Sequence, residues 1–231
     1  MIRYAPLALV LFAAPALAQD RVFSVGSYER VRVDGPFRVM IATGSPKAKA
    51  SGDRQLLERL VVEVNGGTLT VRIGTGGWGE TPTKRGTEPP VVTLTTPRLT
   101  ALAVTAGAEV DVARLAGQRV DLSVTGAGAV TVARAEADQL NAALLGTGTI
   151  TIAGRTNRAR LLTNGLGMID AAALATKDLI VRQDGAGETR AAASYTAQVT
   201  STGLGRVTVV GNAKCTVKAV AGGPVMCGPT L

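Results

Sequence analysis

The sequence contains no histidine, only two cysteines, and only three Phe, three Tyr and one Trp among its 231 residues. Without histidine the chain cannot build a His-dependent catalytic triad or a zinc site with imidazole ligands. Two cysteines are too few for a four-thiolate metal site, and so few aromatic rings leave little for nucleic acid bases to stack on. We therefore expect no metal, no cofactor and no nucleic acid partner.

Long apolar runs are also missing. Residues 5–15 are apolar but too short to span a bilayer, and they precede Ala16-Leu17-Ala18, which is an A-x-A cleavage site. This arrangement predicts a signal peptide at residues 1–18 and a mature chain that begins at Gln19. No cysteine follows directly, which argues against a lipoprotein anchor. No later segment reaches 18 uninterrupted apolar residues, so we expect no transmembrane segment in the mature chain.

Acidic residues are outnumbered, with 17 Asp and Glu against 25 Lys and Arg, for a formal net charge of +8. Such a charge favours anionic partners, for example lipopolysaccharide phosphates, acidic polysaccharide or membrane headgroups. Solubility alone also explains this charge and is the simpler interpretation.

The strongest positive signal is an internal repeat of about 19 residues, marked by Gly-x-Gly. The intervals between the first glycines of successive markers are 20, 19, 20 and 18 residues, and degenerate copies flank the array at 106–108 and 221–223. Apolar and polar residues alternate on both sides of each marker, which indicates two strands per repeat. The marker glycines are Gly126, Gly128, Gly146, Gly148, Gly165, Gly167, Gly185, Gly187, Gly203 and Gly205.

A repeat this short cannot bury its own apolar face, so its copies must stack on one another. We predict an all-β fold, a single-stranded right-handed β-helix (β-solenoid), because parallel crossovers strongly prefer that hand. The marker glycines fit corners where the backbone takes a positive φ and no Cβ is tolerated. A β-sandwich is the alternative, but its hairpins need not repeat their turns in constant register.

Residues 19–231 are expected to form one solenoid domain, with regular Gly-x-Gly coils over 101–228. Residues 19–100 are less regular and predict irregular first coils that cap one end of the stack. A Gly- and Pro-rich loop at 74–90 carries the sole tryptophan, Trp78, and is either a mobile insertion or a binding loop. The expected strands in this half are 30–34, 37–41, 69–73 and 91–94, and a short helix is expected after 51–53.

Cys215 and Cys227 are twelve residues apart, near the C-terminal end of the sequence. In an exported protein two cysteines usually pair, and both fall at inward positions of the last coil. We therefore predict a disulfide that staples this coil, with a stabilisation of about 3 kcal/mol by the chain-entropy model. The competing interpretation, a redox pair, does not fit a spacing that differs from C-x-x-C.

Several segments, considered together, carry a family resemblance. They are the exported start, residues 31–41 (VRVDGPFRVMI), 55–57 (QLL), 65–71 (NGGTLTV), 95–102 (TTPRLTAL), the Gly-x-Gly coils and the closing CTV and VMCG segments. In this combination the chain resembles the autotransporter adhesin head domain family, also called the GIN domain, a bacterial exported domain. The resemblance covers about 30–228 and implies a β-helical fold, and it carries over no catalytic residue.

Candidate binding residues are few. Arg114, Arg134 and Arg155 fall near the same position of successive coils. They predict either a stacked arginine edge suited to repeated anionic groups or three solvated corner residues. Glu109 and Asp111 form a carboxylate pair on one strand face, roughly 6.6 Å apart, which a solvated face explains better than catalysis.

We therefore expect an exported, non-enzymatic β-solenoid that acts as a binding or scaffolding surface of the cell envelope. The expected partner is an anionic envelope glycan or a protein. The periplasm is favoured, because signal peptide and solenoid fill the 231 residues and leave no visible outer-membrane translocator. The alternatives are a surface adhesin and a carbohydrate-active enzyme.

Overall fold

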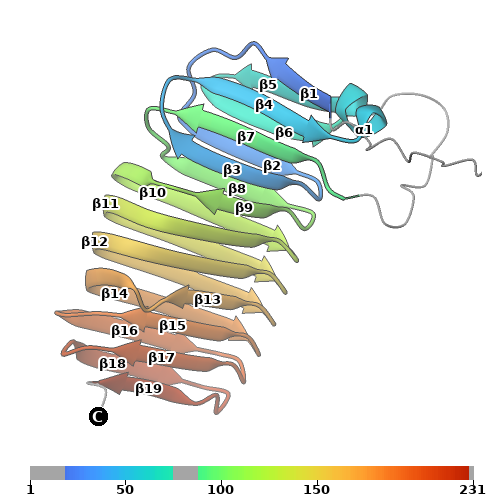
Figure 1. Cartoon of the computed structure of the whole chain (residues 1–231). Helices are drawn as coiled ribbons and strands as arrows, with labels where there is room; N and C mark the ends of the chain where they lie inside the picture. Colours follow the sequence, from blue (N-terminus) through green and yellow to red (C-terminus); the bar gives the residue numbers. More distant parts are fainter. Residues whose placement is uncertain (1–18, 75–87, 229–231) are drawn as a thin grey trace, which may run out of the picture.

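The computed structural model describes residues 19–74 and 88–228, and its strands form the stacked parallel coils of a β-solenoid of about six turns (Figure 1). The predicted signal peptide, most of the 74–90 loop and Trp78 lie outside the described residues. Neighbouring coils pair in parallel and nearly in register, which confirms the solenoid and excludes the sandwich. No helix in the described part of the chain is long and apolar enough to cross a membrane.

The elements alternate strand and corner along almost the whole described chain. They are β1 (Gln19–Phe23), β2 (Arg30–Asp34), β3 (Arg38–Thr43), β4 (Lys47–Gly52), α1 (Arg54–Arg59), β5 (Leu60–Asn65), β6 (Thr68–Ile73), β7 (Val91–Thr96), β8 (Ala101–Thr105), β9 (Glu109–Val112), β10 (Leu115–Gly126), β11 (Ala129–Gly146), β12 (Thr149–Gly165), β13 (Met168–Ala171), β14 (Leu174–Gly185), β15 (Glu188–Ala192), β16 (Thr196–Ser201), β17 (Arg206–Val210), β18 (Lys214–Ala219) and β19 (Val225–Gly228).

Each regular coil has three sides, which we call the first, second and third sheets. The first sheet stacks β6, β2, β8, the C-terminal parts of β10 to β12, β14, β16 and β18. The second sheet stacks β7, β3, β9, the N-terminal parts of β11 and β12, β13, β15, β17 and β19. The third sheet is narrow and joins 115–117, 135–137, 154–156 and 174–176.

The core is a set of aliphatic ladders inside the stack. Val110, Val130, Ile150 and Ile169 occupy one such ladder in the second sheet, and none is more than 1% exposed. Strict alternation places these residues inward and their neighbours outward, as the sequence predicted.

Several inward positions of the C-terminal coils are polar, and three of them are hydrogen-bonded to one another. Thr163 and Thr189 share a hydrogen bond of 2.7 Å between their hydroxyl oxygens, and the Thr189 hydroxyl donates to the Gln183 side-chain oxygen at 2.6 Å. All three residues are fully buried. Their mutual hydrogen bonds reduce the cost of placing polar groups in the core.

The two glycines of each marker are required for different structural reasons. Gly146 has φ +129°, in the region that favours glycine. Gly148 has no such φ, but a Cβ there would lie 2.3 Å from the carbonyl oxygen of Gly128 in the preceding coil. The Gly148 amide also donates to the Gly126 carbonyl at 2.9 Å, which ties the corners together. Positive φ is thus confined to Gly126, Gly146, Gly165 and Gly185 among the marker glycines, fewer than the sequence suggested.

The N-terminal half does not stack in chain order. Strand β2 lies between β6 and β8, and β3 lies between β7 and β9, all in parallel. The chain crosses this inserted coil after β7. Tyr28 anchors the crossing, because its buried hydroxyl donates to the Thr95 carbonyl at 2.7 Å and its carbonyl accepts from the Thr96 hydroxyl. Residues 30–43 are therefore an internal coil, where the sequence suggested an end.

The cap of this end is built from antiparallel strands instead. β1 pairs with β4, β4 with β7, and β5 with β6. The predicted short helix is present as α1, whose N-cap Asp53 accepts hydrogen bonds from the amides of Gln55 and Leu56. At the opposite end a disulfide joins Cys215 of β18 to Cys227 of β19, as predicted.

Candidate functional site

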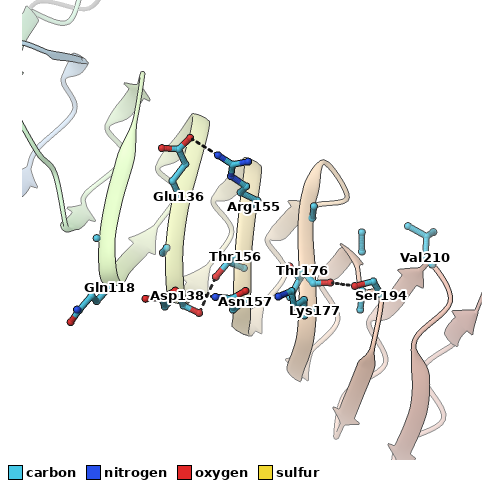
Figure 2. Close-up of a pocket in the computed structure, with 16 residues that line it drawn as sticks. Gln118, Glu136, Asp138, Arg155, Thr156, Asn157, Thr176, Lys177, Ser194 and Val210 are labelled. Atoms are coloured by element: carbon cyan, nitrogen blue, oxygen red, sulfur yellow. Dashed lines mark hydrogen bonds and ion pairs between the residues drawn. The ribbon is translucent and has the colours of Figure 1, made fainter.

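A groove with a volume of about 950 Å³ follows the third sheet across successive coils (Figure 2). Its floor consists of small residues, including Gly117, Ala137, Thr156, Thr176 and Ala193. The hollow arises because the third-sheet segments are only about three residues long and carry short side chains at these positions. Larger polar side chains stand on either side of the floor.

One wall of the groove is a ladder of four polar residues, Gln118, Asp138, Asn157 and Lys177, which we call the corner ladder (Figure 2). Each directly follows a third-sheet segment, and those segments pair in register, so the four side chains stack along the solenoid at about 4.8 Å per coil. The Asn157 amide donates to the Asp138 carboxylate at 2.9 Å. The ladder therefore presents amide, carboxylate and ammonium groups in one row.

The predicted arginine edge adjoins the opposite wall of the groove. The guanidinium groups of Arg114, Arg134 and Arg155 approach the Glu136 carboxylate at 2.6, 3.9 and 3.7 Å. Arg155 and Glu136 line the groove directly (Figure 2). The three arginines thus form a cluster around one carboxylate, and their charge is partly neutralised.

The cluster also fixes the ionisation of Glu136. The hydrogen bond from Arg114 lowers the pKa of this carboxyl, and the charges of Arg114, Arg155 and Arg134 lower it further against the opposing effect of desolvation. Glu136 is therefore ionised at neutral pH and holds no proton to donate.

The charges that line the groove balance, with Arg155 and Lys177 against Glu136 and Asp138. The arrangement suits a ligand that exchanges many hydrogen bonds and carries little net charge. Within the described ranges no cluster of three or more Cys, Asp and Glu residues could hold a metal ion.

The carboxylate pair singled out in the sequence lies on the second sheet, outside this groove. Glu109 is paired with Arg38 at 2.8 Å, and Asp111 is exposed two residues further along β9. Neither residue is among those that line the groove.

Sequence reasoning missed the corner ladder, because its four members differ in chemical type. Their signal is positional. They follow the first position of their markers by 12, 12, 11 and 12 residues, counted from Ala106, Gly126, Gly146 and Gly165.

Comparison with known proteins gives one family and several solved structures. Residues 27–213 match the family model described as "Putative auto-transporter adhesin, head GIN domain". A comparison with curated proteins finds no match.

The solved structures share the fold at low identity. A putative adhesin from Bacteroides fragilis is 18% identical with a TM-score of 0.81, and the alignment covers 93% of this chain and 98% of that one. A putative adhesin from Parabacteroides distasonis is 19% identical with a TM-score of 0.73, over 94% and 98% of the two chains. A structure described as a putative lipid binding protein from the same organism is 17% identical with a TM-score of 0.71, also over 94% and 98%.

Proposed function

The chain belongs to the auto-transporter adhesin head GIN domain family, and we propose that it is an exported, non-enzymatic β-solenoid that binds an extended envelope glycan in the third-sheet groove. The corner ladder is the observation that carries this proposal. It offers hydrogen-bond donors and acceptors at a regular spacing on a rigid scaffold, and a glycan chain presents hydroxyls at regular intervals. Groups that are already in place lose little conformational entropy on binding.

The absence of a catalytic role is supported by the state of the groove carboxylates. A glycosidase needs one carboxyl with a raised pKa as general acid. The pKa of Glu136 is lowered, so this carboxyl does not meet that requirement. This observation favours a binding surface over a reaction centre.

Export is supported by the disulfide between Cys215 and Cys227, because disulfides persist in oxidising compartments outside the cytosol. The predicted signal peptide at 1–18 points the same way. We place the protein in the periplasm as part of the proposal.

Binding to isolated peptidoglycan chains and to lipopolysaccharide polysaccharide, measured by calorimetry, tests the groove. The double variant Asn157→Ala/Lys177→Ala should bind about tenfold more weakly, the equivalent of about one to two hydrogen bonds. The matched control Asn164→Ala/Lys218→Ala removes the same groups from exposed positions on the glycine corner and the first sheet, and should bind like the unaltered protein. Equal losses in both doubles, or no binding of either polymer, would refute the groove as a glycan site.

The family description favours a second function, adhesion at the outer surface. Protease treatment of intact cells, with and without permeabilisation of the outer membrane, separates the two. Loss of the protein only after permeabilisation supports the periplasm, whereas loss from intact cells supports an adhesin.

A further inference from the structure

A second groove, with a volume of about 680 Å³, lies on the outer surface of the first sheet. Arginine is the most frequent residue type in its lining, which is therefore positively charged, whereas the charges that line the third-sheet groove balance. Asp121 is its only acidic lining residue. The five arginines, which we call the arginine face, are Arg30, Arg32, Arg119, Arg158 and Arg160.

The out-of-order stacking assembles this face. Arg30 pairs in register with Ala101, and the same row continues through Asp121 and Asn141 to Arg160. Arg30 and Arg160 are thus 130 residues apart in sequence but four coil steps apart in space, roughly 19 Å. Strand β2 is inserted beside β8 (Figure 1). This insertion brings the two N-terminal arginines onto the same surface as the other three.

The centre of the arginine face is hollow because its floor is made of small residues. Ala101, Ala103, Ser123 and Ala143 lie between the arginine-bearing strands. Long guanidinium side chains therefore surround a shallow floor on which a polymer chain can lie.

The arginines of this face are only partly engaged. Arg32 pairs with Asp34 at 2.7 Å, and the Arg119 guanidinium donates to the Gln139 side-chain oxygen at 3.2 Å. Arg158 and Arg160 make no side-chain hydrogen bond or ion pair with any residue in 19–74 or 88–228. The one acidic group, Asp121, already accepts a hydrogen bond from Asn141 at 2.7 Å.

We propose that the arginine face binds a linear acidic polysaccharide, whose carboxylates pair with the guanidinium groups. Guanidinium binds carboxylate through two parallel hydrogen bonds, so arginine suits this class of ligand. Arg119 and Arg158 occupy one row two coils apart, about 9.6 Å, close to the length of one disaccharide unit.

The other classes of polyanion fit less well. The strongly exposed large hydrophobic residues of the described chain, such as Leu166, Leu204 and Val220, are not among the residues that line this groove, so they cannot anchor it in a bilayer. Its lining also contains no aromatic ring for base stacking. The site lies on a different sheet from the groove of the proposed function, and the two can be tested separately.

Calorimetry with polygalacturonate, and with its methyl ester as the uncharged form of the same chain, tests the proposal. We expect the protein to bind polygalacturonate but not its methyl ester. The affinity for polygalacturonate should fall about tenfold or more in Arg158→Gln/Arg160→Gln. The control double Arg190→Gln/Arg206→Gln removes the same charge from exposed positions of the second sheet and should change the affinity less than about twofold, because surface charges at a distance are screened. Asn157→Ala/Lys177→Ala should leave polygalacturonate binding intact while it weakens the proposed glycan binding.

Three outcomes would overturn the proposal. Equal weakening in both arginine doubles would mean that net charge alone attracts the polymer. Equal affinity for the methyl ester would remove the role of the carboxylates. Binding of vesicles rich in phosphatidylglycerol without binding of polygalacturonate would assign the face to a membrane. Circular dichroism spectra and melting temperatures of each double variant check that the fold is retained. If Arg158→Gln/Arg160→Gln has a lower melting temperature, the single variant Arg158→Gln is tested in its place, with an expected loss of affinity of about threefold.

Discussion

Substitution of Gly187 by alanine should destabilise the protein through coil-to-coil contact. A Cβ at this position would lie 2.2 Å from the Gly167 carbonyl oxygen of the preceding coil, and the backbone there has no positive φ. The corner must therefore open, and the hydrogen bond from the Gly187 amide to the Gly165 carbonyl, now 2.9 Å, is strained or lost. Overpacking costs about 1–3 kcal/mol and a hydrogen bond about 1 kcal/mol, against a gain of about 0.4–1 kcal/mol from the stiffer unfolded chain.

The expected loss is about 2 kcal/mol, which lowers the melting temperature by roughly 4–8 °C in a domain of this size. Thermal and urea unfolding followed by circular dichroism measure it. The matched control is Gly107→Ala, because Gly107 has φ +83° but a Cβ added there would meet no atom within 4 Å, so it isolates backbone strain of about 1 kcal/mol. A Gly187 variant no less stable than the Gly107 variant would refute the close-approach argument.

Three further results are expected. Replacement of Cys215 and Cys227 by serine should cost about 3 kcal/mol and speed amide exchange in β18 and β19 before the other strands. The pKa of Glu136 is lowered in the folded protein, so its contribution to stability is complete above pH 4.5, its unfolded pKa, and is lost as the pH falls through the lower folded pKa. Glu136→Gln should therefore reduce the dependence of the melting temperature on pH at the acid end of the range. Burial raises the pKa of Tyr28 from 10.0 to about 12. Its contribution to stability is therefore present below pH 10 and is lost toward pH 12, and Tyr28→Phe should remove this late step from an ultraviolet titration.

The regular half of the solenoid was predictable because its signals are local. The Gly-x-Gly interval, the alternation on either side of it and the inward placement of the two cysteines each follow from a few neighbouring residues. The short helix was predictable for the same reason, since Asp53 caps it and Leu57 is buried on one face.

The order of the N-terminal coils was not predictable in this way. Strand β2 (RVRVD) and strand β8 (ALAVT) show the same inward alternation, so either fits beside β6 or β10 by pattern alone. The crossing held by Tyr28 decides the order, and its partners Thr95 and Thr96 lie 67 and 68 residues away in sequence.

The candidate sites were likewise predictable only in part. Spacing in the sequence found the arginine edge, but only the fold shows that Glu136 gathers Arg114, Arg134 and Arg155. The corner ladder escaped notice because its members share a position and not a chemical type.

By itself, then, the sequence determined the repeating unit, the inside and outside of each strand, the glycine corners and the disulfide, because each depends on residues at most one coil apart. The tertiary structure alone decided which coils are neighbours, and therefore which charges meet. Arg30 and Arg160 share one face only because β2 is inserted into the stack, and pairing over such a distance is settled by the packing of the whole core.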